Sequence, residues 1–426
     1  MARQVVVVGA GVAVLGLTSF GYLSVAGRVL GPADVVPLTT LWVLVNAVGP
    51  ALFFPLEQEV GRAVAARQAV GLGARQVFGQ AAVVAATLMA VLTLGCVAAG
   101  VPLSRSLFDG HPIVVLAFLL GSAGLCAQYL VRGAFAGIGD FGRYGAQLGI
   151  DGVLRLGGAV ALAAAASTAV EGYALVLGIA PVLAVLLTAP RPARILADGP
   201  PGQWTDIGSA LALLVAGTVC AQFVVNAAPI AANLLADSTA QAELGVFLNA
   251  YVLVRVPLLG FAAIQAALLP GLARLAAVGD RAAYRRRLEV ILLLVAALGA
   301  AGVLTVAAAG PWLVRLAFGA DFVTTRADLL PLALATATYM GALVLSQALI
   351  SLRAYRASLA GWAAGSLAFV LALLVPAALE LRVGLAFLAA SAVSTAVLAG
   401  CTVLRLRSRR GAGPRPAGRV DDVAGP

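Results

Sequence analysis

The residues of this sequence that could do chemistry are a few ionisable and amide side chains inside long apolar runs. Gln147, Asp151 and Arg155 follow one another at intervals of four, which places them on one face of a helix. Such residues are rare because an ionised side chain at the bilayer centre costs about 2.5–3.5 kcal/mol on insertion scales. Asp151 and Arg155 could neutralise each other within the helix. Alternatively, Arg155 could bind an anion in a cavity and Asp151 could couple to a proton or ion.

A second set of polar residues lies in two later runs. Gln222 and Asn226 share a helical face, and Asn249 and Arg255 lie close together in the next run. Amides are suited to hydroxyl ligands, and a guanidinium is suited to an anion. Arg255 lies near the middle of its run with no acidic residue within one turn, which favours a water-filled or ligand-binding cavity around it.

Further charged groups lie near the ends of the runs. Glu57 and Glu59 precede Arg62 where the second run ends. This pattern is typical of a solvated helix end with local ion pairing, and the alternative is a gating or coupling role. Arg132 shares a face with Gln128 and lies close enough to its helix end to reach the lipid headgroups.

The apolar runs that must position these side chains are long enough to cross a membrane. A helix rising about 1.5 Å per residue needs about 20 residues to span a hydrocarbon core about 30 Å thick. The runs lie near residues 4–26, 35–56, 77–100, 113–135, 144–166, 170–190, 207–235, 243–270, 288–314, 328–350, 357–379 and 383–404. Pro229 and Pro257 predict kinks within their runs, not helix ends.

The runs predict an all-α polytopic membrane protein with about twelve transmembrane helices. Two six-helix lobes would occupy residues 1–200 and 201–404, followed by a disordered basic tail at 405–426. Shifting the second half onto the first by 212 residues aligns Arg62 with Arg274 and Arg75 with Arg287. Parallel repeats of this kind are related by an axis along the membrane normal, and a cleft between them can open to alternate sides.

Arginine gives the runs an orientation. All 28 basic residues are arginines, and they cluster in every second gap between the runs. Because cytoplasmic loops carry the excess of positive charge, we predict a multi-pass protein of the cytoplasmic membrane with both termini in the cytoplasm. The net charge of +10 is then explained by helix ends that contact anionic membrane lipids, and nucleic acid is not an expected partner.

The composition excludes several classes of protein. Hydrophobic residues make up 62% of the chain and charged residues 11%, which leaves too little polar surface for a soluble fold. A nucleotide-binding GxxxxGK[ST] motif is missing, as is any lysine to complete one. The single His111 and four cysteines without CxxC spacing predict neither a metal site nor a hydrolytic triad. We expect no catalytic residues, no metal and no cofactor.

Three short segments then carry a resemblance that covers most of the chain. They are Gly27–Pro32, which matches R-x-L-G-P; the stretch with Gly245, Asn249, Arg255 and Pro257 that ends in Ala267–Pro270; and Leu316–Phe322, which matches L-x-F-G-x-x-[FY]. In this order and at these topological positions, the chain resembles the polysaccharide exporters of the multidrug/oligosaccharidyl-lipid/polysaccharide flippase superfamily. Val35 and Val36 replace the aromatic-Gly pair that is usual after Pro32, which leaves the subfamily open.

The resemblance implies a two-lobed, MATE-like transporter that flips a polyprenyl-diphosphate-linked oligosaccharide by alternating access. In such a protein, Arg255 and Arg155 would contact the diphosphate, and Asn226, Asn249 and Gln222 would face the glycan. The acidic residues Asp151, Glu57 and Glu59 would serve coupling or gating. Glycosyltransferases and a polymerase of the same pathway would be partners.

Two other functions remain open at this point, as does a non-transporting membrane scaffold. A cation-coupled multidrug or small-molecule antiporter of the same superfamily would share the architecture, but should carry more acidic residues in its cleft. A membrane-embedded glycan-processing enzyme should carry acidic residues on a large external loop, whereas the loops here are short. The resemblance favours a transporter and not an enzyme.

Overall fold

The computed structural model of the chain is helical, and it describes residues 2–108, 110–188, 197–199, 204–235, 247, 250–251, 253–318 and 323–408. Within these ranges no strand occurs, and ten helices are long and apolar enough to cross a membrane. Each predicted apolar run overlaps a helix or, for the second run, an uninterrupted series of helical segments. The prediction of an all-α polytopic membrane protein is confirmed.

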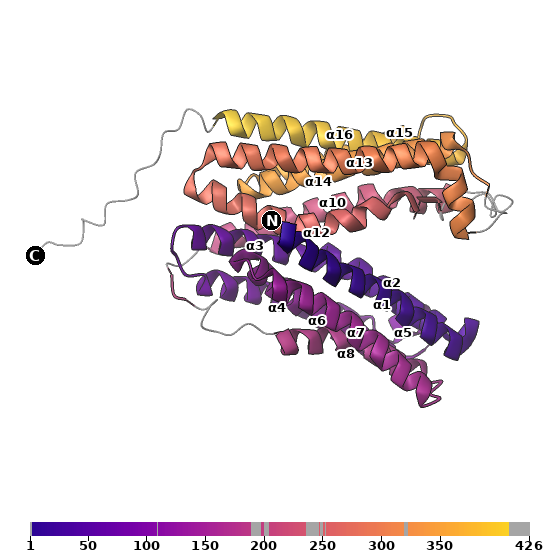
Figure 1. Cartoon of the computed structure of the whole chain (residues 1–426). Helices are drawn as coiled ribbons and strands as arrows, with labels where there is room; N and C mark the ends of the chain where they lie inside the picture. Colours follow the sequence, from indigo (N-terminus) through magenta and orange to yellow (C-terminus); the bar gives the residue numbers. More distant parts are fainter. Residues whose placement is uncertain are drawn as a thin grey trace, which may run out of the picture.

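The helices of the first half form one bundle, coloured indigo to magenta in Figure 1. They are α1 (Ala2–Asp34), α2 (Val36–Val48), the π-helical turn η1 (Gly49–Phe53), α3 (Phe54–Ala69), α4 (Arg75–Ala98), α5 (Gly100–Leu107), α6 (Pro112–Ile138), α7 (Phe141–Ala164) and α8 (Val170–Thr188). In this N-terminal bundle α1 packs along α7, and α6 packs against both α3 and α8.

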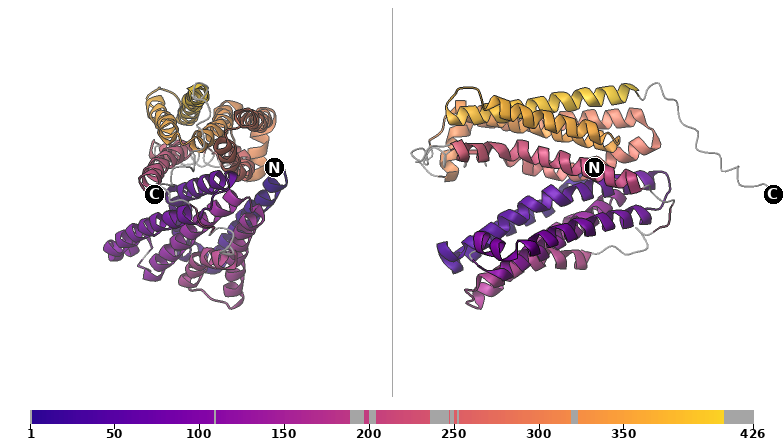
Figure 2. Two further views of the ribbon diagram at one scale, coloured as in Figure 1. Left: turned by 90° about the vertical axis from the view of Figure 1, so that its left-hand side faces the viewer. Right: turned by 180° about the vertical axis from the view of Figure 1, so that it is seen from behind.

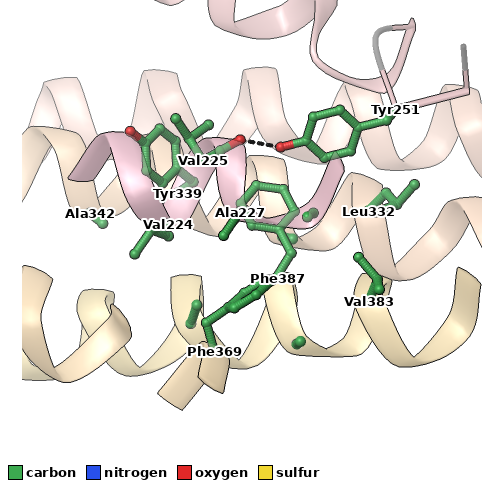
Figure 3. Close-up of a cluster of buried hydrophobic side chains, with 14 of the residues drawn as sticks. Val224, Val225, Ala227, Tyr251, Leu332, Tyr339, Ala342, Phe369, Val383 and Phe387 are labelled. Carbon is green, nitrogen blue, oxygen red and sulfur yellow. Dashed lines mark hydrogen bonds between the residues drawn. The ribbon is translucent and has the colours of Figure 1, made fainter. Parts of the chain in front are cut away.

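The helices of the second half form the C-terminal bundle. They are α10 (Trp204–Leu235), α12 (Val256–Val278), α13 (Arg281–Phe318), α14 (Arg326–Ser351), α15 (Tyr355–Ala372) and α16 (Leu379–Ser408). Aromatic rings fill its core: Phe387 lies 5.8 Å from Tyr251 and 6.4 Å from Tyr339 between ring centroids (Figure 3). The Tyr251 hydroxyl also donates to the Val225 carbonyl of α10, which fixes the segment before α12 against the bundle.

The two bundles meet along α3 and α12 and diverge toward the other end of the molecule (Figures 1 and 2). α12 also packs on α1, and α10 packs on α3. α1 begins and α16 ends on the side where the bundles meet (Figure 1). The molecule is thus closed at the end where α1 begins and α16 ends, and splayed at the opposite end. The arginine pattern predicts that the closed end faces the cytoplasm.

The second membrane helix is longer than the sequence predicts. The apolar run ends near residue 56, but the chain continues through η1 into α3 and stays helical to Ala69. Pro50 and Pro55 each lie in the first positions of a helical segment, where a missing N–H is tolerated. Glu57 and Glu59 are therefore buried within the protein, with 7% and 4% of their surface exposed. The prediction of a solvated helix end was wrong.

Other helix boundaries also differ from the predicted ones. In the eighth run, predicted as one kinked helix over 243–270, the described residues 247, 250–251 and 253–254 are helical, the helix is interrupted at Arg255, and α12 then extends from Val256 to Val278. The interruption lies beside Pro257, where the sequence predicts a kink. The gap between the eighth and ninth predicted runs, residues 271–287, is largely helical because α12 extends to Val278 and α13 begins at Arg281. The predicted tail begins later, since α16 continues to Ser408, and residues 409–426 lie outside the described part of the chain.

Glycines let α6 and α3 approach closely. A Cβ atom at Gly133 would lie 2.8 Å from the Glu57 carbonyl oxygen, and one at Gly137 would lie 2.6 Å from Val64 Cβ. Small residues spaced four apart allow such close helix packing in membranes. This contact sets the position of Glu57 relative to α6.

Adding a side chain at this contact should therefore destabilise the N-terminal bundle. Gly137→Val is expected to lower the free energy of unfolding by about 1–3 kcal/mol, the usual cost of overpacking. Gly95→Val is the matched control, because a Cβ atom at Gly95 meets nothing within 4 Å. Thermal unfolding of the two purified variants measures the difference, and equal midpoints would contradict the packing argument.

Candidate functional site

Two adjoining cavities lie between the bundles. One, of about 230 Å³, is enclosed mainly by α1, α3, α6, α7 and α12. The other, of about 380 Å³, is enclosed mainly by α3, α10, α12, α14 and α15. Their shared lining residues are Phe54, Gln58, Tyr129, Gln265 and Gln347. Together they form what we call the interlobe cavity, which side chains of both bundles line.

Amide groups are the main polar feature of the shared wall. Gln58 of α3 and Gln347 of α14 are 7% and 2% exposed, and the Oε1 atom of each has no hydrogen-bond partner among the described residues. Leaving a buried acceptor without a partner lowers the stability of the folded protein by about 1–3 kcal/mol, so such atoms are rare in native structures unless they have a function. Their position on a cavity indicates that these oxygens accept hydrogen bonds from a ligand or from water held there.

Aromatic and hydroxyl groups line the C-terminal side of the interlobe cavity. Tyr339, Tyr355 and Trp362 border it together with Ser346 and Ser358. The Trp362 indole donates to Ser346 Oγ at 3.1 Å, and Ser346 Oγ lies 2.8 Å from Ser358 Oγ. These bonds hold the indole and both hydroxyl groups in fixed positions on the wall.

A buried ion pair lines the N-terminal side of the interlobe cavity. Arg132 Nε donates to Glu57 Oε2 at 3.0 Å, and the Tyr144 hydroxyl donates to Glu57 Oε1 at 2.7 Å. The Arg132 guanidinium carbon also lies 4.4 Å from the centroid of the Tyr129 ring. Arg132 is only 5% exposed, so the prediction that it reaches the lipid headgroups was wrong. α3, α6 and α7 are thus tied together at the cavity wall.

Two polar contacts join the bundles beside the cavity. The Tyr355 hydroxyl of α15 donates to Glu59 Oε2 at 2.8 Å, while Arg62 Nε donates to the same carboxylate oxygen at 2.9 Å. Arg274 of α12 donates to the Gly137 carbonyl at the end of α6, at 2.5 Å. Arg62 and Arg274, which the 212-residue shift aligns, thus both lie where the bundles meet. These contacts hold the closed end together.

Removing the Tyr355 hydroxyl should loosen this closure. A hydrogen bond to a charged group contributes about 1.5–3 kcal/mol, so Tyr355→Phe should raise the population open at this end by about tenfold or more. Tyr284→Phe is the matched control, because the Tyr284 hydroxyl bonds to Ala348 and Ser351 within the C-terminal bundle. Labelling of a cysteine introduced at Gln58 reports opening. Equal labelling rates in both variants would contradict this role.

Asp151 and Arg155 form the intrahelical pair that the sequence left as one of two alternatives. Arg155 Nε and Nη2 donate to the two carboxylate oxygens of Asp151, each at 2.8 Å. The residues are 1% and 4% exposed, and neither lines the interlobe cavity. Their charges neutralise each other inside α7, so Arg155 and Asp151 are not placed to contact a ligand in this conformation.

Arg255, Asn226 and Gln222 lie together, as the sequence grouping suggested. Arg255 directly precedes α12. Its guanidinium carbon lies 5.0 Å from the centroid of the Tyr251 ring, and its Nη1 lies 3.5 Å from Asn226 Oδ1. Within the described part of the chain no carboxylate forms a salt bridge with Arg255. Gln222, one turn before Asn226, lines the interlobe cavity. Asn249 lies outside the described residues.

The comparisons with solved structures identify the fold. A crystal structure of a MATE in complex with MaL6 superposes with a TM-score of 0.78 at 15% identity, covering 96% of each chain. A Vibrio cholerae MATE transporter in its bent form gives 0.78 at 15% identity over 96% of this chain and 98% of that one. A MOP superfamily transporter from Pyrococcus furiosus gives 0.74 at 15% identity over 96% of both.

The comparisons with curated proteins identify the relatives. No family model matches the chain. The uncharacterized protein Rv1510 of Mycobacterium tuberculosis is 34% identical over 308 residues, which cover 69% of this chain and 67% of that protein. The uncharacterized protein Rv3630 of the same organism is 30% identical over 294 residues, covering 65% and 64%. This multi-pass membrane protein thus has the MATE transporter fold and belongs to the family of Rv1510.

Proposed function

We propose that the chain is a transporter that flips a polyprenyl-diphosphate-linked oligosaccharide across the cytoplasmic membrane by alternating access. The proposal rests on one observation above all: Gln58 and Gln347 present buried amide oxygens, unpartnered among the described residues, to the interlobe cavity. Sugar hydroxyls are the donors that such oxygens need. The rings of Trp362 and Tyr339 on the same wall add apolar surface for the faces of sugar rings.

The charge of the interlobe cavity favours a glycan over a cationic drug. Glu57 is the one carboxylate among the described lining residues, and Arg132 neutralises it. A cation antiporter would need an acidic group free to bind its substrate or coupling ion. In the Pyrococcus furiosus transporter, a reversed polarity of the binding pocket suggests a different function, so this fold is compatible with pockets of different chemistry.

The diphosphate of the substrate is assigned to Arg255 in this proposal. Its guanidinium carries a fixed charge without a described acidic partner and offers paired donors to phosphate oxygens. Asn226, which lies beside it, and Gln222 would extend contacts toward the glycan, with Asn249 as the predicted fourth member. Arg155 is not assigned to the diphosphate, because its Nε and Nη2 groups already donate to the two carboxylate oxygens of Asp151.

Energy coupling is assigned to carboxylates of the second membrane helix. Asp151, the sequence-based candidate, is held by two hydrogen bonds to Arg155 away from the interlobe cavity. Glu57 lines the cavity, and Glu59 receives the Tyr355 hydroxyl from the other bundle. Glu59 is assigned a gating role, because its contact with Tyr355 must break for the two bundles to separate at the closed end.

A leaflet-accessibility assay tests the proposed function. Proteoliposomes with the purified chain and a fluorescent polyprenyl-diphosphate oligosaccharide are treated with a membrane-impermeant reagent that destroys the label in the outer leaflet. We expect the chain to expose the inner-leaflet pool, while a cationic dye loaded into the same vesicles stays inside. Dye efflux without movement of the glycan would instead establish a drug antiporter. The predicted partner enzymes of the same pathway would supply and consume this substrate.

A further inference from the structure

A second cavity, apolar throughout most of its lining, lies on the C-terminal bundle outside the interlobe cavity. It has a volume of about 570 Å³ and lies between the start of α12, α13 and α14. Its lining includes Val256, Pro257, Ala301, Gly302, Thr336 and Met340, and it contains no charged side chain among the described residues. We call it the apolar groove. Val256 is 52% exposed, so the groove is open at the protein surface.

The apolar groove and the interlobe cavity lie on two sides of the same helices. On α14, Thr336, Ala337 and Met340 line the groove, whereas Tyr339 and Leu343 line the interlobe cavity. The start of α12 is a second boundary, because Val254 and Val256 line the groove while Arg255 between them points to Asn226 of α10. The polar and the apolar site thus share α14, and Arg255 lies between two groove residues in the sequence with its guanidinium beside Asn226 of α10.

This juxtaposition fits an amphiphile whose parts differ in the same order. The proposed substrate has a glycan, then a diphosphate, then a long hydrocarbon chain; the protein has an amide-lined cavity, then Arg255, then the apolar groove. A volume of about 570 Å³ is in the range of about 300–1,000 Å³ found for small-molecule sites. We propose that the apolar groove binds the first isoprene units of the polyprenyl chain while the diphosphate contacts Arg255. This inference rests on the proposed function.

Two adjacent alanines of α13 provide a matched test. Ala301 lines the groove and Ala300 does not, and both are exposed. Ala301→Trp should fill the groove and weaken binding of the long-chain oligosaccharide diphosphate by about tenfold or more, because each buried methylene contributes measurably to affinity. Binding of the same oligosaccharide diphosphate without any isoprene unit is expected to change much less, and Ala300→Trp should bind both ligands as the unmodified chain does.

The outcomes separate this inference from the proposed function. Unchanged long-chain affinity in Ala301→Trp, with glycan transport intact in the unmodified chain, would overturn the groove assignment alone. Failure of the unmodified chain to bind either ligand would overturn both. If Ala301→Trp does not fold, a diazirine on the first isoprene unit gives the answer in the unmodified chain. Cross-links to α13 and α14 that unlabelled substrate removes support the assignment; cross-links that only phospholipid removes identify a lipid site and overturn it.

Discussion

Replacing Glu57 by alanine is expected to lower the free energy of unfolding by about 3–5 kcal/mol, because it leaves the Arg132 guanidinium buried without a counter-charge. Arg132 and Glu57 are 6% and 7% exposed at their side chains and lie 3.0 Å apart, so both charges are largely withdrawn from bulk solvent. The loss of the Tyr144 hydrogen bond adds to the effect. Denaturation of the purified variant in detergent, followed by circular dichroism, measures this change.

Two comparisons make the Glu57 result specific. Asp198→Ala breaks the ion pair with Arg75. The side chains of Arg75 and Asp198 are 57% and 84% exposed, so the free energy of unfolding should fall by less than about 1 kcal/mol. The double replacement Glu57→Met with Arg132→Met removes both charges and should recover most of the lost stability. A Glu57→Ala variant as stable as Asp198→Ala would show that the pair does not hold the N-terminal bundle together.

Replacing both Gln58 and Gln347 by leucine is expected to slow flipping about tenfold to a hundredfold while the protein remains folded. Each neutral hydrogen bond contributes about 0.5–1.5 kcal/mol, and the double variant would lose two such bonds to the substrate. Stability should fall little or rise, since both Oε1 atoms lack a partner in the described part of the protein. The flipping rate in proteoliposomes and the unfolding midpoint must be measured on the same preparation.

Gln68→Leu is the matched control for this double variant. Gln68 lies on α3 with Gln58 but is exposed and does not line the interlobe cavity. It should leave both flipping and stability unchanged. A double variant that unfolds readily would indicate that the two amides are structural, and one that flips at the normal rate would remove them from the substrate path.

The fold was predictable from the sequence because membrane thickness sets the length of every apolar run. The end of the second membrane helix was not predictable. Charged residues such as Glu57, Glu59 and Arg62 indicate a helix end when their partners are unknown. Glu57 pairs with Arg132, 75 positions away, and Glu59 pairs with Tyr355, 296 positions away. Local spacing cannot reveal such distant partners, and only the packing of α3 inside the protein makes the charges tolerable.

The candidate site was predictable only in part, for a similar reason. The Asp151 and Arg155 pair follows from spacing within one helix, and Gln222 and Asn226 were grouped correctly on α10. Gln58, Gln265 and Gln347 come from three helices, and a single amide in an apolar run gives no indication of what it faces. A search for isolated glutamines within membrane helices would have found them, together with others such as Gln128 that bond elsewhere.

Equilibrium binding of the fluorescent polyprenyl-diphosphate oligosaccharide to the purified chain tests most directly whether Gln58 and Gln347 receive the glycan. We predict that the unmodified chain and Gln68→Leu share one dissociation constant, and that the Gln58→Leu and Gln347→Leu double variant binds about tenfold or more weakly. The same dissociation constant in all three proteins would contradict the account.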